Sequence, residues 1–303
     1  MTNLKVNIAG VSFKNPVITA SGCFGFGREY ECMYPLEKLG GISLKGMTFQ
    51  EKLGNPPPRI AETPSGMLNS VGLQNPGVEH FLEHDMPYLA KQDTVKIANI
   101  AGSSIEDYCA IAERLSDSEI DMFELNISCP NVKEGGAAFG TSCESAERVV
   151  KEVRKYAKKP MIVKLSPNVT DIVSIAKAVE AQGADAVSLI NTLLGMRIDI
   201  NTRRPILKNN VGGLSGPAIF PVAVRMVWQV ANAVKVPVIG MGGIEKWQDA
   251  IEMMMAGANA IQIGAAMFYN PMAPVQVIEG MRKWLEDNHI EDINEIVGSV
   301  RPW

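Results

Sequence analysis

Short β-branched runs alternate with longer amphipathic stretches along most of the chain. Eight such runs occur, at residues 16–22, 41–46, 95–102, 122–128, 161–167, 186–192, 236–243 and 260–266. Strands that are separated by helices favour a parallel sheet. Eight βα units within 303 residues therefore predict an α/β fold, a closed (β/α)8 or TIM barrel. An open doubly wound sheet is the alternative, but no G-x-G-x-x-G fingerprint follows the first run.

Three segments fall outside this alternation. Residues 4–15 alternate about Ala9 and Gly10, which predicts an N-terminal hairpin. Residues 47–77 are Pro-rich and read as a long irregular loop, and residues 193–216 form a second long connection. Both follow predicted strands, so we expect them at the C-terminal face of the barrel, where such folds carry their active sites. We expect one domain spanning residues 1–303.

Several helix starts carry capping signals. Ser103 and Thr141 are each followed three residues later by a glutamate, the spacing of a capping box. Asn270 precedes a proline and is expected to cap the last long helix.

Composition excludes several classes of protein. The formal net charge of −4 argues against a nucleic-acid-binding surface. No run approaches ~18 apolar residues, so no membrane span is expected, and the first residues lack the pattern of a secretory signal. The five cysteines show no C-x-x-C spacing, so neither a disulfide framework nor an iron–sulfur cluster is expected on this chain. These features favour a cytoplasmic protein.

Polar residues gather where the predicted strands end. At a single strand such a residue could simply lie where the strand ends and the chain becomes exposed to solvent. Polar residues at the ends of five strands in succession favour a functional site. Lysines there would face an anion unless they extend to water, and asparagines suit a flat, uncharged heterocycle. The residues are Lys45, Asn99, Asn126 with Cys129, Lys164, and Asn191 with Thr192.

Two further motifs allow more than one interpretation. "GMGGI" and "IGAAM" end the last two strands, where backbone N–H groups commonly bind phosphate, although the glycines could also only cap a turn. "HFLEH" at 80–84 matches the inverted zinc-protease signature. A zinc site needs a third protein ligand, so a solvated helix face is the preferred interpretation and no metal site is expected.

The chain resembles a known family through motifs that occur in order over nearly its whole length. "SLKG", "NSVGLQNPG", "NISCPN", "MIVKLSP", "GGLSGPA" and "GMGGI" are similar to those of dihydroorotate dehydrogenases. The resemblance implies a (β/α)8 barrel that holds one FMN per chain at its C-terminal face. It also implies oxidation of (S)-dihydroorotate to orotate in pyrimidine biosynthesis.

The resemblance assigns roles to individual residues. Cys129 matches the catalytic base that removes a proton from C5 of dihydroorotate. The positions that match substrate contacts are Lys45, Asn69, Val71, Gly72, Leu73, Asn126, Asn131, Asn191 and Thr192. The positions that match FMN contacts are Ser21, Lys45, Gly46, Asn99, Asn126, Lys164, Ile190, Gly216, Gly242, Gly243, Gly264 and Ala265.

Physical chemistry agrees with a role for Cys129 but does not require one. A free thiol has a pKa near ~8.5, and the positive charge of Lys45 would favour its thiolate. Pro130 restricts Cys129 to extended backbone, and "KEGGAAFG" offers hinges for a flap over the site. A buried, inert cysteine is the alternative.

The resemblance is strongest to the NAD-linked class 1B. That class implies a partner subunit carrying FAD and a [2Fe–2S] cluster, with two catalytic chains in a heterotetramer. The fumarate-reducing class 1A and a dihydropyrimidine dehydrogenase subunit are alternatives within flavin barrels. An aldolase with a Schiff base at Lys164 is the alternative from a different class of enzyme.

Overall fold

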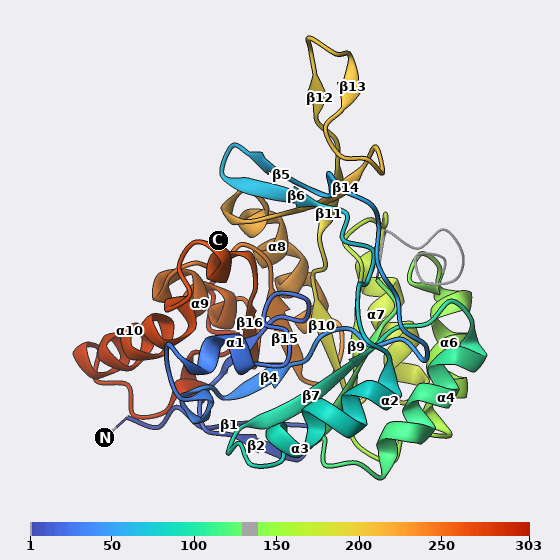
Figure 1. The fold of residues 1–303 in the computed structure, drawn as a ribbon. Helices are drawn as coiled ribbons and strands as arrows, with labels where there is room; N and C mark the ends of the chain where they lie inside the picture. Colours follow the sequence, from blue (N-terminus) through green and yellow to red (C-terminus); the bar gives the residue numbers. More distant parts are fainter. Residues whose placement is uncertain (1, 129–138) are drawn as a thin grey trace.

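The computed structural model describes residues 2–128 and 139–303, and its centre is a closed barrel of eight parallel strands (Figure 1). The closed order is β10-β15-β16-β3-β4-β7-β8-β9. Each predicted run contains one barrel strand, so the predicted (β/α)8 fold is confirmed. The strands are β3 (Val17–Thr19), β4 (Gly41–Ser43), β7 (Val95–Ile100), β8 (Met122–Asn126), β9 (Met161–Lys164), β10 (Ala186–Leu189), β15 (Val238–Met241) and β16 (Ala260–Ile263).

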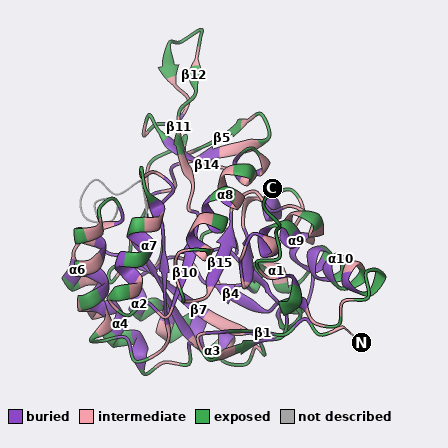
Figure 2. Cartoon of the chain, turned by 180° about the vertical axis from the view of Figure 1, so that it is seen from behind, coloured by how far each residue is buried: buried purple, intermediate pink, exposed green. Residues whose placement is uncertain are grey.

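Helices surround the barrel and turn their buried faces toward it (Figure 2). In α6 the buried residues are Ala146, Val149, Val150 and Val153, a spacing of three and four that places them on one face. The long helices are α4 (Ile105–Ser116), α6 (Cys143–Arg154), α7 (Ile172–Ala181), α8 (Phe220–Ala231), α9 (Trp247–Met255) and α10 (Ala273–Asp287). Shorter helical segments are α1 (Arg28–Glu31), α2 (Val78–His80), α3 (Met86–Leu89), η1 (Leu36–Lys38), η2 (Phe81–Asp85), η3 (Pro217–Ile219), η4 (Ala265–Phe268) and η5 (Ile293–Ile296).

The predicted capping residues were wrong by one to two positions. Ser104, not Ser103, caps α4, because its side chain accepts the backbone N–H of Asp107. Ser142, not Thr141, caps α6. Met272 precedes α10 in place of the predicted Asn270, whose side chain donates to Gln276 instead, at 2.9 Å.

The predicted N-terminal hairpin is present and lies at the end of the barrel opposite the site (Figure 1). It consists of β1 (Val6–Ile8) and β2 (Val11–Phe13). Ala9 and Gly10 have φ values of 51° and 87°, as a tight two-residue turn requires. Phe13 is buried against β4, since a Cβ on Gly41 would lie 2.9 Å from its ring. The hairpin therefore contributes to the barrel core.

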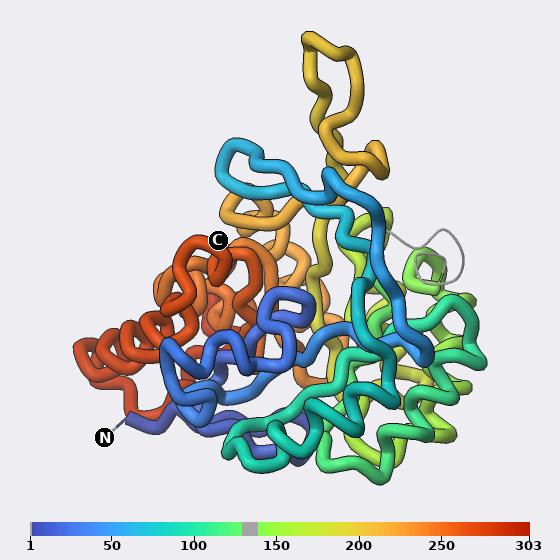
Figure 3. Tube along the Cα trace, viewed as in Figure 1, coloured from blue at the N-terminus to red at the C-terminus, as the bar shows by residue number. Residues whose placement is uncertain are grey.

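The two long connections form a second sheet above the barrel. β5 (Ile60–Thr63) and β6 (Gly66–Asn69) come from the first connection, and β11 (Leu193–Gly195) and β14 (Gly212–Ser215) from the second. They pair antiparallel in the order β11-β14-β6-β5, which we call the cap sheet. Figure 3 shows these two distant parts of the chain meeting above the barrel. The expectation of an irregular loop over 47–77 was thus wrong for residues 60–69.

A small hairpin of β12 (Ile198–Asp199) and β13 (Arg204–Pro205) extends beyond the cap sheet (Figure 1). In the described ranges, none of the helices combines the length and the apolar character needed to cross a membrane.

Candidate functional site

A large cavity opens between the C-terminal ends of the barrel strands and the cap sheet. Its empty space amounts to about 1300 Å³, the open mouth included. Every expected site residue that the structure describes lines this one cavity. These residues are Ser21, Lys45, Gly46, Asn69, Val71, Gly72, Leu73, Asn99, Asn126, Lys164, Ile190, Asn191, Thr192, Gly216, Gly242, Gly243, Gly264 and Ala265. Cys129 and Asn131 lie outside the described residues.

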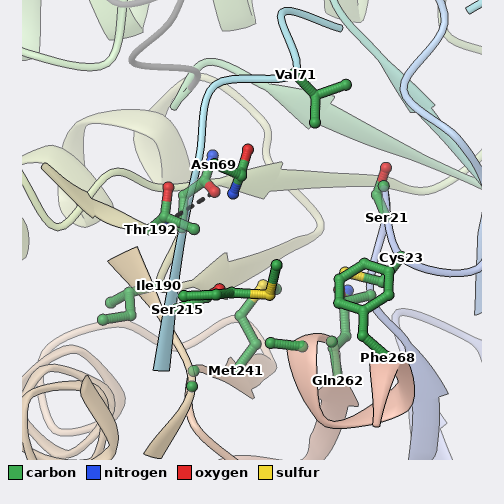
Figure 4. Close-up of a pocket in the computed structure, with 18 of the residues that line it drawn as sticks. Ser21, Cys23, Asn69, Val71, Ile190, Thr192, Ser215, Met241, Gln262 and Phe268 are labelled. Carbon is green, nitrogen blue, oxygen red and sulfur yellow. Dashed lines mark hydrogen bonds between the residues drawn. The ribbon is translucent and has the colours of Figure 1, made fainter. Parts of the chain in front are cut away.

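The side chains approach the cavity from several directions. Figure 4 shows Asn69 and Thr192 on one side, Ser21 and Phe268 on the other, and Met241 between them. The expected residues therefore form a continuous lining although they come from strands far apart in the chain.

Sequence reasoning missed part of this lining. The additional residues are Ala20, Gly22, Cys23, Ile60, Met67, Ser215, Ile219, Met241, Ile244, Glu245, Gln262, Ala266 and Phe268. Most are apolar or small and look like ordinary strand ends or loop residues. Gln262 carried a usable signal, since it is a polar residue inside the apolar run 260–266.

Amide and hydroxyl groups at the end of β8 and in the segments just after β8 and β10 form a connected chain at one wall. Ser128 donates its hydroxyl to Oδ1 of Asn126 at 2.8 Å, and Asn191 donates its amide to the hydroxyl oxygen of Ser128 at 2.8 Å. Asn191 Oδ1 in turn accepts the backbone N–H of Thr192 at 2.8 Å. Ser128 is the last described residue before Cys129, so these bonds fix the point from which the Cys129 segment departs. Ser128 was not among the expected site residues.

The cap sheet and the segment that follows β6 form another part of the wall. Gly72 has a φ of 76°, and a Cβ there would lie 2.7 Å from the side chain of Asn55. Asn75 accepts the N–H of Thr48 at 3.1 Å and donates to the carbonyl oxygen of Leu73 at 2.7 Å. These contacts hold residues 69–75 in place over the cavity.

Three glycines form a tight backbone cradle near the ends of β14 and β15. Gly216, Gly242 and Gly243 have φ values of 102°, 122° and 76°, which side chains rarely adopt. A Cβ on Gly243 would lie 2.7 Å from the Cβ of Phe220 and 2.9 Å from the carbonyl oxygen of Gly216. A side chain therefore fits poorly here, and the close-packed backbone can approach a ligand directly.

Lys164 and Gln262 bring polar groups to the floor of the cavity. Lys164 is 5% exposed, and its positive charge acts on the buried carboxylate of Glu124. Gln262 Oε1 is buried and accepts no hydrogen bond from the described part of the chain. Such an atom indicates that a bound molecule completes the site.

The "HFLEH" segment lies away from this cavity. The rings of His80 and His84 are in edge contact with centroids 4.3 Å apart, and His80 Nδ1 is 3.9 Å from Asp85. Among residues 2–128 and 139–303, no three His, Cys, Asp or Glu side chains are arranged to hold a metal ion.

Comparison with known proteins bears on the identity of this site. A sequence model described as dihydroorotate dehydrogenase matches residues 3–285. The chain belongs to the dihydroorotate dehydrogenase family. The resemblance inferred from the motifs is thereby confirmed.

Curated relatives within this family match along nearly their whole length. A protein of Alkaliphilus metalliredigens is 59% identical over 98% of this chain and 99% of its own. One from Alkaliphilus oremlandii is equally similar, with the same coverage, and one from Lachnoclostridium phytofermentans is 56% identical over 99% of this chain and 100% of its own. All three are named dihydroorotate dehydrogenase B (NAD(+)), catalytic subunit.

Proposed function

We propose that this chain oxidises (S)-dihydroorotate to orotate with FMN bound in the cavity, as the catalytic subunit of an NAD-linked enzyme. The observation that carries the proposal is the common location of the described site residues, since all of them line one cavity at the C-terminal face. The names of the relatives support the same reaction.

The cavity suits FMN at both ends of that molecule. Gly216, Gly242 and Gly243 form the kind of backbone cradle that binds a phosphate after the late strands of such barrels. Lys164 offers a donor, and Gln262 an acceptor, to the polar edges of a flat ring. When bound, FMN would be the two-electron oxidant and would accept the hydride from C6 of the substrate.

The chain's own residues position dihydroorotate and take up its proton. Asn69, Asn126, Asn191 and Thr192 present amide and hydroxyl groups that match the carbonyl and N–H edges of a pyrimidine. Lys45 brings a positive charge for the substrate carboxylate.

In this proposal Cys129 acts as the general base. Its thiolate takes the proton from C5, and the C5–H electron pair forms the C5=C6 double bond as the hydride leaves C6. The hydrogen bonds of Ser128 fix the base of the segment that carries Cys129.

The assembly is also part of the proposal. A partner subunit with FAD and a [2Fe–2S] cluster would pass electrons to NAD, and two catalytic chains would join two such partners in the cytoplasm. The term "catalytic subunit" in the relatives' names supports a partner chain. We further propose that residues 1–303 act as one FMN-binding domain.

A steady-state assay tests the proposal. The purified chain alone, and then with its electron-transfer partner, is given dihydroorotate with NAD, fumarate or a dye as acceptor. We expect dye reduction by the chain alone and NAD reduction only with the partner. NAD reduction by the chain alone would contradict the proposed partner, and fumarate reduction would indicate the class 1A enzyme instead.

A further inference from the structure

The carboxylate of Glu124 lies behind the cavity lining and accepts hydrogen bonds from residues of four other barrel strands. Glu124 Oε2 accepts the hydroxyl of Ser43 at 2.8 Å and the amide of Asn99 at 2.6 Å. Its Oε1 accepts the hydroxyl of Ser188 at 2.9 Å and the amide of Gln262 at 2.7 Å. All five residues are at most 1% exposed. The carboxylate therefore sits in the barrel interior with two donors on each oxygen.

This arrangement keeps Glu124 ionised. Burial alone would raise the pKa of the carboxyl, but the charge of Lys164 and the hydrogen bonds from Ser43, Asn99 and Gln262 outweigh it, so that the pKa lies below its usual range. A negative charge is thus fixed inside the barrel, close enough to Lys164 for the two to interact electrostatically.

The carboxylate also determines which atoms two cavity residues present. An ionised carboxylate only accepts hydrogen bonds, so it selects the NH2 groups of Asn99 and Gln262. Their oxygens must then point elsewhere. Asn99 Oδ1 lies 3.4 Å from the amide of Asn126, and Gln262 Oε1 is left buried without a donor among the described residues. Both side chains line the cavity.

We propose that Glu124 is a positioning residue that sets the reduction potential of the bound flavin. It does so by opposing the charge of Lys164 and by fixing the orientation of the amide groups of Asn99 and Gln262, two residues of the cavity lining. Glu124 itself does not touch the flavin or the substrate. This proposal rests on the proposed function, because it requires FMN in the cavity.

The charge of Glu124 disfavours added negative charge on a nearby ring, whereas Lys164 favours it. Removal of the Glu124 charge at constant side-chain size should therefore stabilise the anionic reduced flavin relative to the oxidised one. We expect Glu124→Gln to raise the affinity for reduced FMN over oxidised FMN by about tenfold relative to wild type, which corresponds to about +30 mV for a two-electron couple.

The experiment combines FMN titration of the apoprotein, followed by fluorescence, with a dye-equilibrated redox titration of the loaded protein. Ser43→Ala is the matched control, since it removes one donor to the same carboxylate and leaves the charge in place. We expect Ser43→Ala to lower the melting temperature of the apoprotein but to leave the ratio of the two affinities within about twofold of wild type.

A second background keeps the test decisive if Glu124→Gln folds poorly. In a Lys164→Met chain, Glu124→Gln removes the remaining charge of the pair, so neither charge is buried without its counterpart. The ratio of the affinity for reduced FMN to that for oxidised FMN should still rise. An unchanged ratio in both backgrounds would overturn the positioning role while wild-type FMN binding still supported the proposed function. A wild-type chain that binds no FMN would overturn both proposals.

Discussion

The glycine cradle allows a sharp test of how the cavity holds FMN. Gly243 and Gly10 both have positive φ, 76° and 87°, so alanine at either position carries a similar backbone strain of about 1–2 kcal/mol. Their surroundings differ. A Cβ on Gly10 meets nothing within 4 Å, whereas one on Gly243 would lie 2.7 Å from the Cβ of Phe220 and 2.9 Å from the oxygen of Gly216.

Gly243→Ala should therefore displace the cradle as well as strain it. Ordinary contact between such atoms needs 3.4 Å or more, so the segment at Gly216 and Phe220 must move by several tenths of an ångström. Loss of one or two charge-assisted N–H bonds to a phosphate costs about 2–4 kcal/mol. We expect FMN to bind roughly 30- to 1000-fold more weakly.

The assay is FMN titration of each apoprotein, together with chemical denaturation. Gly10→Ala should lose stability without losing FMN affinity, because its hairpin lies at the opposite end of the barrel. If the FMN affinity of Gly243→Ala lies within threefold of wild type, the proposed role of the glycine cradle in FMN binding is refuted. Equal weakening by Gly10→Ala would show that general destabilisation is the cause.

Three further predictions concern Ser128, Cys129 and Glu124. Ser128→Ala removes the hydrogen bonds to Asn126 and Asn191, so flavin reduction by dihydroorotate should slow about tenfold with FMN affinity unchanged; a normal rate in stopped-flow experiments would contradict this. Cys129→Ser should keep FMN bound but slow flavin reduction strongly near neutral pH, and an unchanged rate across about pH 6–9 would remove Cys129 from the mechanism. The pKa of Glu124 is lowered on folding, so its ionised form stabilises the protein above the unfolded pKa of about 4.3 and this contribution is lost as the pH falls. The difference in unfolding free energy between wild type and Glu124→Gln should then shrink between about pH 5 and pH 3, and a constant difference in denaturant titrations would contradict the assignment.

The barrel could be predicted because its signals are local. Each strand lies in a short apolar run, and several of the helices that follow show their own apolar periodicity, so most of the order of elements is visible without knowledge of any contact. The residues at strand ends could also be predicted, since the fold places all such ends on one face. Cap positions were less certain, because adjacent hydroxyl residues such as Ser103 and Ser104 compete for the same N–H group.

The cap sheet could not be predicted, because its pairing is non-local. Asn69 of β6 lies opposite Gly213 of β14, and nothing near either residue indicates a partner so distant in sequence. The role of Glu124 was hidden for the same reason. Its donors come from four other strands, and only the presence of one acid within the apolar run 122–128 gave a signal.

The most direct test of the account is an anaerobic experiment on the purified chain without any partner. If the cavity binds FMN and oxidises dihydroorotate, the protein is yellow and loses the absorbance of oxidised flavin when dihydroorotate is added. Dihydrouracil, which lacks the carboxylate, should leave the colour unchanged. A colourless protein that borohydride inactivates together with a carbonyl substrate, or a yellow protein that dihydroorotate does not bleach, would contradict the account.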